Sequence, residues 1–542
     1  MAVEAVAEVV HRRLRNSARE VRLHDRERST RRDQHHHHQD ENHEQPGSRL
    51  TRLREQRTIE DNLRQQRNGN ADERVRHDRY GQGRNTQPVG PKQRENRSDD
   101  TLMLLPQRFG HRRSVARASA RVERQRFGEN ARMSNRRLSA RAFFRDPVGY
   151  ARACPESVIR FSAPTGGFAL IRDPAEIWRL LVTDAGSLTP GKWKRRARRF
   201  VGPTLNTLAA DEHRRRRLLL QPALDRRRIA RFAPAVAMHV ERAIADWRDG
   251  ETIVLRRALD PLSLTAAGEA LLSTDLGPQA ATLADALTGI MAAVPRLTPS
   301  LPGTPGARAL GQVHGTVRDL VARRPDAETD DPDLLDLLLA SGLPQRTVLG
   351  EVTAFLLAAV DEPPSGLAAV WYLLGRNEAV DRRLRVELEG ESRRAEASPD
   401  ELPRAAARYL DAVIAEALRL YPPARHVDRC PVADIHVSGT LLPRGTNILI
   451  SPLVTHREPA LYERPDEFRP ERWLEPGGAA TPRGAYLPFG AGAHTCIGEP
   501  LARLIMETTL ATIVPRWRLR VADDAPLPVP RAHPLVVTLE RR

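Results

Sequence analysis

The strongest constraint on how this 542-residue chain folds is an abrupt change in its character near residue 133. The first 132 residues are rich in Arg, Gln, Asn, Asp and His, and their few apolar residues follow neither a helical nor an alternating period. Such a segment buries too little apolar surface to offset the entropy lost on ordering. We therefore expect residues 1–132 to be a disordered extension, as a mis-assigned start upstream of Met133 would create, and residues 133–542 to form the folded domain.

The net charge of +17 would suit a nucleic-acid partner, but its distribution argues against one. Residues 1–132 hold 30 Lys plus Arg against 20 Asp plus Glu, which leaves only +7 for the other 410 residues. The arginines of the first segment alternate with acids and lack the aromatic side chains on which bases stack. The run His35–His38 has no nearby cysteine or second spaced histidine pair, so we interpret it as a solvated tract rather than a metal site.

Three cysteines, Cys154, Cys430 and Cys496, are too few and too widely spaced for a disulfide framework or a zinc cluster. This usage suits a reducing cytoplasm. No uncharged apolar run approaches about eighteen residues, and no basic-then-apolar leader opens the chain, so neither a membrane span nor a secretory signal is predicted. We expect a soluble, cytoplasmic protein.

Hydrophobic periodicity predicts a mainly α-helical domain with a small β region. Residues 157–174 alternate like two strands around a Gly-Gly turn. Helices are predicted where apolar residues recur at spacings of three and four, at 229–247, 350–375, 404–420 and 500–514. Short strand-like stretches follow at 434–450 and 535–540.

A glycine-rich loop precedes Cys496, and an amphipathic helix follows it. A cysteine at the start of a helix meets backbone N–H groups and the positive end of the helix dipole, which favour the thiolate that binds iron. Gly490, Gly492 and Gly498 allow tight bends and the close approach of a flat ligand, while Phe489 offers an aromatic face. Alone, Cys496 would more often be an inert core cysteine. The combination indicates a binding site.

The pattern Phe489-x-x-Gly492-x-His494-x-Cys496-x-Gly498 resembles the haem-binding signature of the cytochrome P450 family. His494 stands where many members have arginine and many soluble bacterial members have histidine. The resemblance implies a cytochrome P450 fold over about residues 140–542. It also implies that Cys496 is the axial ligand of the iron of haem b, with Phe489, His494 and Gly498 beside the cofactor.

Glu416 and Arg419 lie three residues apart on one helical face, a spacing that by itself usually marks a solvated surface pair. About fifty residues later comes Phe468-Arg469-Pro470-Glu471-Arg472-Trp473. This order resembles the Glu-x-x-Arg motif and the Pro-Glu-Arg segment of the same family. The resemblance implies that Glu416, Arg419 and Arg472 form a buried structural network that supports the cysteine loop.

His213 and Arg217 lie four residues apart on one face of a basic helix that starts near residue 211. The helix is either a solvated basic surface or a source of donors for carboxylates. It resembles the propionate-binding helix of the family, and Arg429 and His494 occupy positions of further propionate contacts. The basic cluster Lys192–Arg199 is either a docking surface for an acidic redox partner or a solvated loop.

The helix from residue 353 resembles the one that crosses the oxygen-binding face of the haem, where the family usually has an acid followed by an alcohol. Here Asp361 keeps the acid, and Glu362 replaces the alcohol. The resemblance makes both residues the implied catalytic groups for proton delivery. The alternative is that they only solvate a kinked helix.

Pro363 and Pro364 lack the N–H groups that would bond the carbonyls of Ala359 and Val360. The sequence therefore predicts a kink that leaves these carbonyls as acceptors for water or dioxygen.

The resemblance implies a haem-thiolate monooxygenase that hydroxylates or epoxidises a small hydrophobic organic substrate with dioxygen. Only 46 residues follow Cys496, too few for a flavin or iron-sulfur domain. The implied electron source is therefore NAD(P)H acting through a separate ferredoxin and ferredoxin reductase. Because the acid-alcohol pair is altered, two alternatives remain: a peroxide-driven or rearranging enzyme, and a haem-bound sensor without turnover. The residues do not specify the substrate.

Overall fold

The computed structural model describes residues 138–162, 167–294, 303–324, 329–397, 408–475, 481–525 and 534–542. All of these residues belong to one structural unit. The expected disordered extension, residues 1–132, and the histidine run within it lie outside the described residues.

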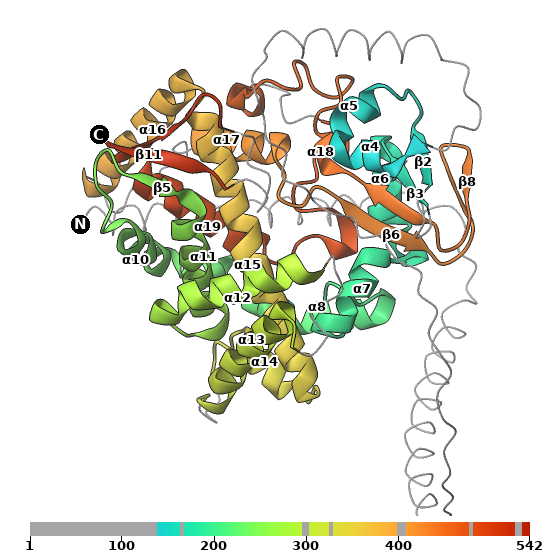
Figure 1. Ribbon diagram of the computed structural model, residues 1–542, viewed down its shortest axis with the longest axis horizontal. Coiled ribbons are helices and arrows are strands. Elements are labelled where there is room, and N and C mark those ends of the chain that lie inside the picture. Colours follow the sequence, from blue (N-terminus) through green and yellow to red (C-terminus); the bar gives the residue numbers. More distant parts are fainter. Residues whose placement is uncertain are drawn as a thin grey trace, which may run out of the picture. The chain divides into compact units, whose positions relative to one another are not determined.

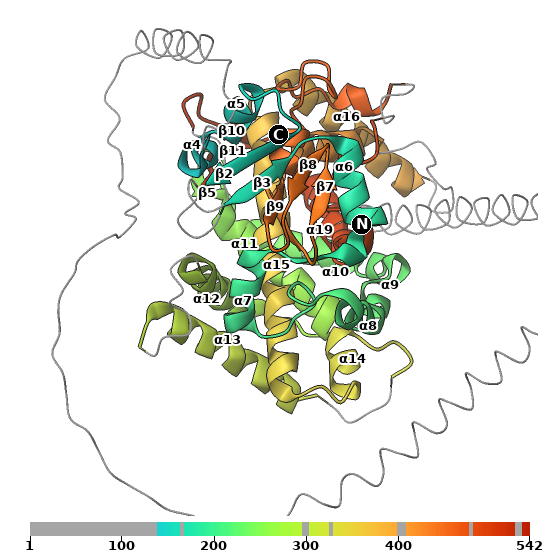
Figure 2. The same ribbon diagram turned by 90° about the vertical axis from the view of Figure 1, so that its right-hand side faces the viewer.

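The described part is mainly helical, as the sequence predicts. Its longer helices are α8 (Ala210–Leu220), α10 (Ala233–Ile244), α11 (Leu255–Leu272), α12 (Ala280–Ala293), α13 (Pro305–Ala322), α15 (Gln345–Leu374), α16 (Glu378–Ala397), α17 (Arg408–Leu420) and α19 (Glu499–Ile513). Helix α15 crosses the middle of the helical region and packs against α11, α12, α13, α17 and α19 (Figures 1 and 2). Most of its side chains beyond residue 358 are buried, as expected for a central helix that is apolar on nearly every face.

Three sheets complete the fold. The largest has the order β1-β2-β3-β9-β6-β4. Its strands are β1 (Leu138–Ser139), β2 (Val158–Ser162), β3 (Phe168–Ile171), β4 (Leu188–Pro190), β6 (Val427–Pro431) and β9 (Asn447–Ile450). The second joins β10 (Trp517–Val521), β11 (Val536–Arg541) and β5 (Thr252–Val254), and the third pairs β7 (Ile435–Val437) with β8 (Thr440–Leu442).

The β predictions are confirmed. Strands β2 and β3 are antiparallel, with Ile159 opposite Leu170, as the alternation over 157–174 predicts. The turn between them, residues 163–166, lies outside the described residues. Strand β9 adds to β3 in parallel, so the segment 434–450 joins a sheet formed by residues far earlier in the chain.

The predicted helices are present, with two differences in extent. The stretch 229–247 is divided between α9 (Arg226–Ala230) and α10, with Arg231 and Phe232 between them. Asp225 accepts a hydrogen bond from the N–H of Arg227 and starts α9. Helix α17 is described from Arg408, and residues 404–407 lie outside the described residues.

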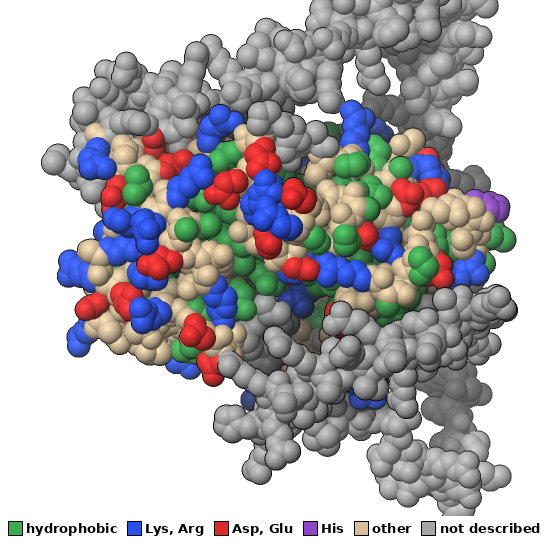
Figure 3. Space-filling view, turned by 90° about the horizontal axis from the view of Figure 1, so that it is seen from above, with side chains coloured by type: hydrophobic (Ala, Val, Ile, Leu, Met, Phe, Trp, Pro, Cys, Tyr) green, Lys and Arg blue, Asp and Glu red, His purple; other side chains and the backbone are tan. Residues whose placement is uncertain are grey.

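The surface gives no continuous basic face in the view of Figure 3, where Lys and Arg side chains are interspersed with Asp and Glu. Within the described ranges, no helix combines the length and apolar character needed to cross a membrane.

Candidate functional site

Cys496 follows a short 3-10 turn (Gly492–His494) and precedes α19. Its N–H donates a hydrogen bond to the carbonyl of Phe489 at 2.8 Å, which closes the loop on itself. Gly490 and Gly492 have φ of 73° and 71°, conformations that favour glycine. A Cβ on Gly492 would lie 2.0 Å from the carbonyl oxygen of Leu181. The predicted tight bends are therefore present, and the missing Cβ of Gly492 also lets the loop pack closely on the backbone of Leu181.

The surroundings of the Cys496 sulfur disfavour its negative charge more than its position at the start of a helix predicts. Burial raises the pKa of the thiol to about 11, and the carboxylates of Glu362 and Glu499 add to this effect. The N–H of Gly498 and the charge of Arg217 oppose it. The predicted backbone donor is present and favours thiolate, but burial has the larger and opposite effect. A bound metal ion would remove the proton, because a coordinating thiol is deprotonated.

Cys496 and Glu362 interact from two different elements. Glu362 lies on α15 and Cys496 on the loop before α19, and the charge of Glu362 raises the pKa of the thiol. Both side chains are solvent-accessible. Burial is nevertheless the main cause of the raised pKa of each group.

Five basic side chains from four parts of the chain gather near Cys496 and Glu362. They are Lys194, His213, Arg217, Arg429 and His494. Burial and mutual repulsion lower the pKa of Lys194 to about 8, that of His213 to about 4 and that of His494 to about 3. The two imidazole rings lie 3.8 Å apart, and Arg217 donates to the carbonyl of Thr495 at 2.6 Å. The described residues offer none of the five an ion pair.

Lys194 is the member of this group that the sequence analysis missed. The basic cluster Lys192–Arg199 is a helix, α7 (Lys192–Val201), rather than a loop. The N–H groups of Lys192 and Trp193 donate to Asn447 and Asp428, each at 3.0 Å, and fix the start of α7 against β9 and β6. The Lys194 charge then interacts with Arg429, Glu362 and Cys496. Nothing in a run of basic residues marks which one faces inward.

Lys194, Arg217 and Arg429 are neighbouring positive charges without an ion pair among the described residues, which is costly unless an anionic group completes the cluster. His213 and His494 are neutral at pH 7 and add hydrogen-bonding nitrogens. A haem supplies two propionate carboxylates and an iron that binds thiolate. The donor set therefore fits a haem, with His213, Arg217, Arg429 and His494 at the carboxylates and Cys496 at the iron. Phe489 packs under Arg503, whose guanidinium lies 5.4 Å from the ring centre, and thereby holds the loop from below.

The carbonyls of Ala359 and Val360 in α15 are not the free acceptors that the sequence had predicted from the two prolines. The helix is continuous through Pro363 and Pro364. The hydroxyl of Ser263 donates to the carbonyl of Ala359 at 2.7 Å, and Arg256 donates to that of Val360 at 3.0 Å. The predicted free acceptors for water or dioxygen are therefore already occupied by side chains of α11.

The two adjacent acids of α15, Asp361 and Glu362, interact with different partners. The Asp361 carboxylate lies 3.8 Å from Arg256 of α11. Glu362 instead interacts with Lys194 and raises the pKa of Cys496. Burial, together with the charge of Asp361, raises the pKa of Glu362 to about 7, whereas Lys194 lowers it. Of the two residues that the sequence selected, Glu362 is the one at the site.

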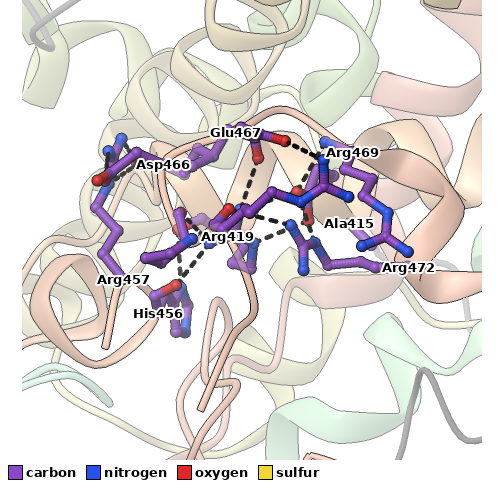
Figure 4. Close-up of polar contacts among 12 residues, drawn as sticks. Ala415, Arg419, His456, Arg457, Asp466, Glu467, Arg469 and Arg472 are labelled. Atoms are coloured by element: carbon purple, nitrogen blue, oxygen red, sulfur yellow. Dashed lines mark hydrogen bonds and ion pairs between the residues drawn. The ribbon is translucent and has the colours of Figure 1, made fainter. Parts of the chain in front are cut away.

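Glu416, Arg419 and Arg472 come together as the sequence predicts (Figure 4). Glu416 and Arg419 are 0% exposed. Arg419 binds both carboxylate oxygens of Glu416 at 2.8 Å, and Arg472 donates to one of them at 2.9 Å. The backbone N–H of Arg469 and the indole N–H of Trp473 complete five hydrogen bonds to this carboxylate.

His456, which sequence analysis missed, joins this network to the cysteine loop. The N–H of Leu487 donates to its Nε2 at 2.8 Å, so Nδ1 carries the proton that bonds the carbonyl of Arg419 at 3.2 Å. Figure 4 shows Arg419 lying between His456 and Arg472. The His456 ring also stacks on Tyr486 at 5.2 Å. His456 directly follows the short helix α18 (Pro452–Thr455), and a single histidine at a helix end carries no sequence signal for this role.

Replacing His456 with leucine is expected to lower the free energy of unfolding by about 2–5 kcal/mol at neutral pH, because the N–H of Leu487 and the carbonyl of Arg419 lose their buried partners. Burial lowers the pKa of His456 from 6.5 to about 3. Between these values the unfolded imidazole binds a proton that the folded one does not, so stability falls as pH falls, by up to about 1.4 kcal/mol per pH unit.

Denaturant titrations across this pH window would test both effects. The wild-type protein and the His436→Leu variant, which alters an exposed histidine, should keep the acid sensitivity. An equally steep loss of stability in His456→Leu would contradict the assignment of a neutral, buried imidazole.

The side chains gathered here, one cysteine beside lysine, arginine and histidine, are of the kinds that suit an anionic, metal-bearing cofactor. A sequence model of the family described as Cytochrome P450 matches residues 308–542. The cyclooctat-9-en-7-ol 5-monooxygenase of Streptomyces melanosporofaciens is 34% identical over 60% of this chain and 74% of its own length. The pentalenene oxygenase of Streptomyces avermitilis is 32% identical over 65% and 82%, respectively.

The fold is shared as well. The solved structure of a six-coordinated cytochrome P450 from Thermus thermophilus aligns with a TM-score of 0.58 and 25% identity, covering 75% of this chain and all of that one. A cyanobacterial structure described as retinoic acid bound aligns with a TM-score of 0.62 at 23% identity, covering 71% and 92%. This chain belongs to the cytochrome P450 family and is a haem-binding oxidoreductase of the monooxygenase type.

Proposed function

We propose that the chain inserts one oxygen atom from dioxygen into a small hydrophobic organic substrate by hydroxylation or epoxidation. The observation that carries the proposal is the interaction of Glu362 with Cys496 and Lys194. When bound, a haem with an axial thiolate supplies the oxygen chemistry, since the thiolate favours O–O cleavage. Cys496 is assigned as the iron ligand.

The chain's own residues would hold the cofactor. His213, Arg217, Arg429 and His494 would bind the propionates, and Lys194 would add a further cation. Phe489 and Gly498 shape the loop that carries Cys496. The network of Glu416, Arg419 and Arg472 keeps that loop in place through its bonds to backbone carbonyls and through His456.

Glu362 is proposed to move protons into the site. With a pKa of about 7 it exchanges protons readily at neutral pH. Replacing it with glutamine keeps the size and removes the exchangeable proton. We expect product formation to fall about 100-fold, the usual scale of positioned acid-base groups. The wild-type rate should also fall as pH rises through about 7, because the donor form is the protonated acid, and the variant should lose this dependence.

Rates of product formation and of peroxide release over a pH series would check this role. Asp361→Asn is the matched control, because the Asp361 carboxylate lies beside Arg256 rather than in the site, and a much smaller loss is expected. An equal loss in both variants would refute the assignment to Glu362.

The substrate is proposed to be a cyclic terpene or a terpene alcohol. The support comes from the relatives, whose names refer to cyclooctat-9-en-7-ol and pentalenene. We further propose that residues 133–542 form the catalytic domain, that the protein acts in the cytoplasm, and that NAD(P)H supplies electrons through a ferredoxin and its reductase, as in soluble bacterial members of the family.

Turnover of a terpene panel with isotopically labelled dioxygen would test the reaction. Label in the product, dependent on ferredoxin, reductase and NAD(P)H, is the expected result. A second candidate, a peroxide-driven enzyme, is favoured by one observation: Glu362 occupies the place where the family usually has an alcohol. Turnover with peroxide but not with the electron-transfer partners would favour that candidate, and tight binding without product under either condition would contradict both.

A further inference from the structure

Two consecutive prolines in the middle of α15 leave two backbone carbonyls without their usual donors, and side chains of α11 supply donors instead. Pro363 and Pro364 cannot donate to the carbonyls one turn back, and a buried carbonyl without a donor costs about 1–3 kcal/mol. These positions are buried, so water is a poor substitute. Ser263, which is fully buried, and Arg256 replace the missing donors from α11, which packs along α15.

Arg256 does more than replace one donor. Its Nη2 donates to the carbonyl of Val360 at 3.0 Å, and its Nη1 donates to the carbonyl of Asp361 at 3.3 Å and to the hydroxyl of Ser365 at 2.8 Å. The same guanidinium lies 3.8 Å from the Asp361 carboxylate and 2.7 Å from Asp260. The Arg256 side chain is only 13% exposed, so these contacts are weakly screened.

Consecutive residues of a helix point about 100° apart, so Asp361 and Glu362 cannot share one direction. Once Arg256 holds the backbone and carboxylate of Asp361 against α11, the next side chain is turned toward Lys194 and Cys496. We propose that Arg256 is a positioning residue, which determines that Glu362 rather than Asp361 enters the site. The proposal rests on the proposed function, because it concerns the acid that function uses.

The charged groups that face Glu362 define what a change at Arg256 would do. They are Asp361 on its own helix, Lys194 of α7 and Cys496 of the loop before α19. With Arg256 in place, the negative charge of Asp361 is opposed by a close cation. Without it, the charge of Asp361 loses this cation and acts more strongly on Glu362, and the carbonyl of Val360 loses its donor.

The test is a pH titration of the ferric, haem-loaded full chain, followed by the infrared band of protonated carboxyl groups. The band that disappears in Glu362→Gln reports Glu362, and its midpoint in the wild type is the reference for the other variants. In Arg256→Met the midpoint should rise by about one pH unit, because a like charge disfavours ionisation. Arg256→Lys retains a cation beside Asp361 and should largely restore the wild-type midpoint.

Arg257→Met is the matched control, since Arg257 is the adjacent arginine of α11 and is exposed. It should titrate as the wild type does. A wild-type midpoint in Arg256→Met, or a carboxyl band unaffected by Glu362→Gln, would overturn the positioning role. The carbon-monoxide spectrum of thiolate-bound haem, recorded on each sample, would still be present in those cases, whereas its absence from the wild type would instead refute the proposed function.

Discussion

Cys496→Ser is expected to abolish the reduced, carbon-monoxide-bound Soret band typical of thiolate-ligated haem, and with it all measurable monooxygenase turnover. The reason is chemical. A thiolate is a strong, electron-rich iron ligand, and a serine hydroxyl at the same position does not replace it. The absorption spectrum of the full chain, before and after reduction under carbon monoxide, measures the effect directly.

The fold should survive this change. Serine is close to cysteine in size, and the Cys496 side chain is solvent-accessible rather than part of the hydrophobic core. Cys154→Ser is the control, because Cys154 lies apart from the site between α5 (Pro147–Arg152) and β2. It should keep the band. A wild-type spectrum in Cys496→Ser would refute the ligand assignment, and the same loss in Cys154→Ser would show that the effect is not specific.

Glu416→Ala is expected to lower the free energy of unfolding by about 3–5 kcal/mol, the cost of leaving a buried charge without its partner. Arg419 and Arg472 would both lose the carboxylate that holds them, at a position with no access to water. The cysteine loop should loosen as a consequence, since Tyr486 bonds the carbonyl of Ala415 and His456 links Arg419 to Leu487. Loss of haem on dilution should therefore accompany the loss of stability.

Glu389→Ala is a suitable control, because Glu389 also pairs with an arginine of its own helix, Arg385, at 2.7 Å, but both side chains are 33% exposed. A surface pair of this kind contributes about 0.5 kcal/mol. Thermal unfolding and haem retention of the two variants would be compared. Equal, small losses in both would mean that the buried network contributes no more than a surface ion pair.

The sequence predicted the architecture where a local signal exists. The alternation over 157–174, the apolar spacing of α15, α17 and α19, and the order of the motifs around Glu416, Arg472 and Cys496 all depend on neighbours in the chain. A helix or strand places residues on one face by its own period, so periodicity alone indicates such elements. Family membership followed from the same local patterns.

The sequence did not show which faces of the helices and strands pack against one another. Asp361 and Glu362 are adjacent acids, and only the packing of α11 against α15 brings Arg256 to one and leaves the other beside Cys496. Lys194 is one of six basic residues in Lys192–Arg199. The hydrogen bonds that the start of α7 donates to Asp428 and Asn447 decide that Lys194 turns inward.

The same reason explains His456, whose partners lie 31 and 37 residues away, and the thiol of Cys496, where burial outweighs the local helix terminus. The helices, the strands and the order of the motifs could be predicted from the sequence, because they depend on short-range geometry. Charge state, side-chain direction and the partner of each buried group were decided by the tertiary structure, because desolvation and long-range contacts exist only once distant segments have packed together.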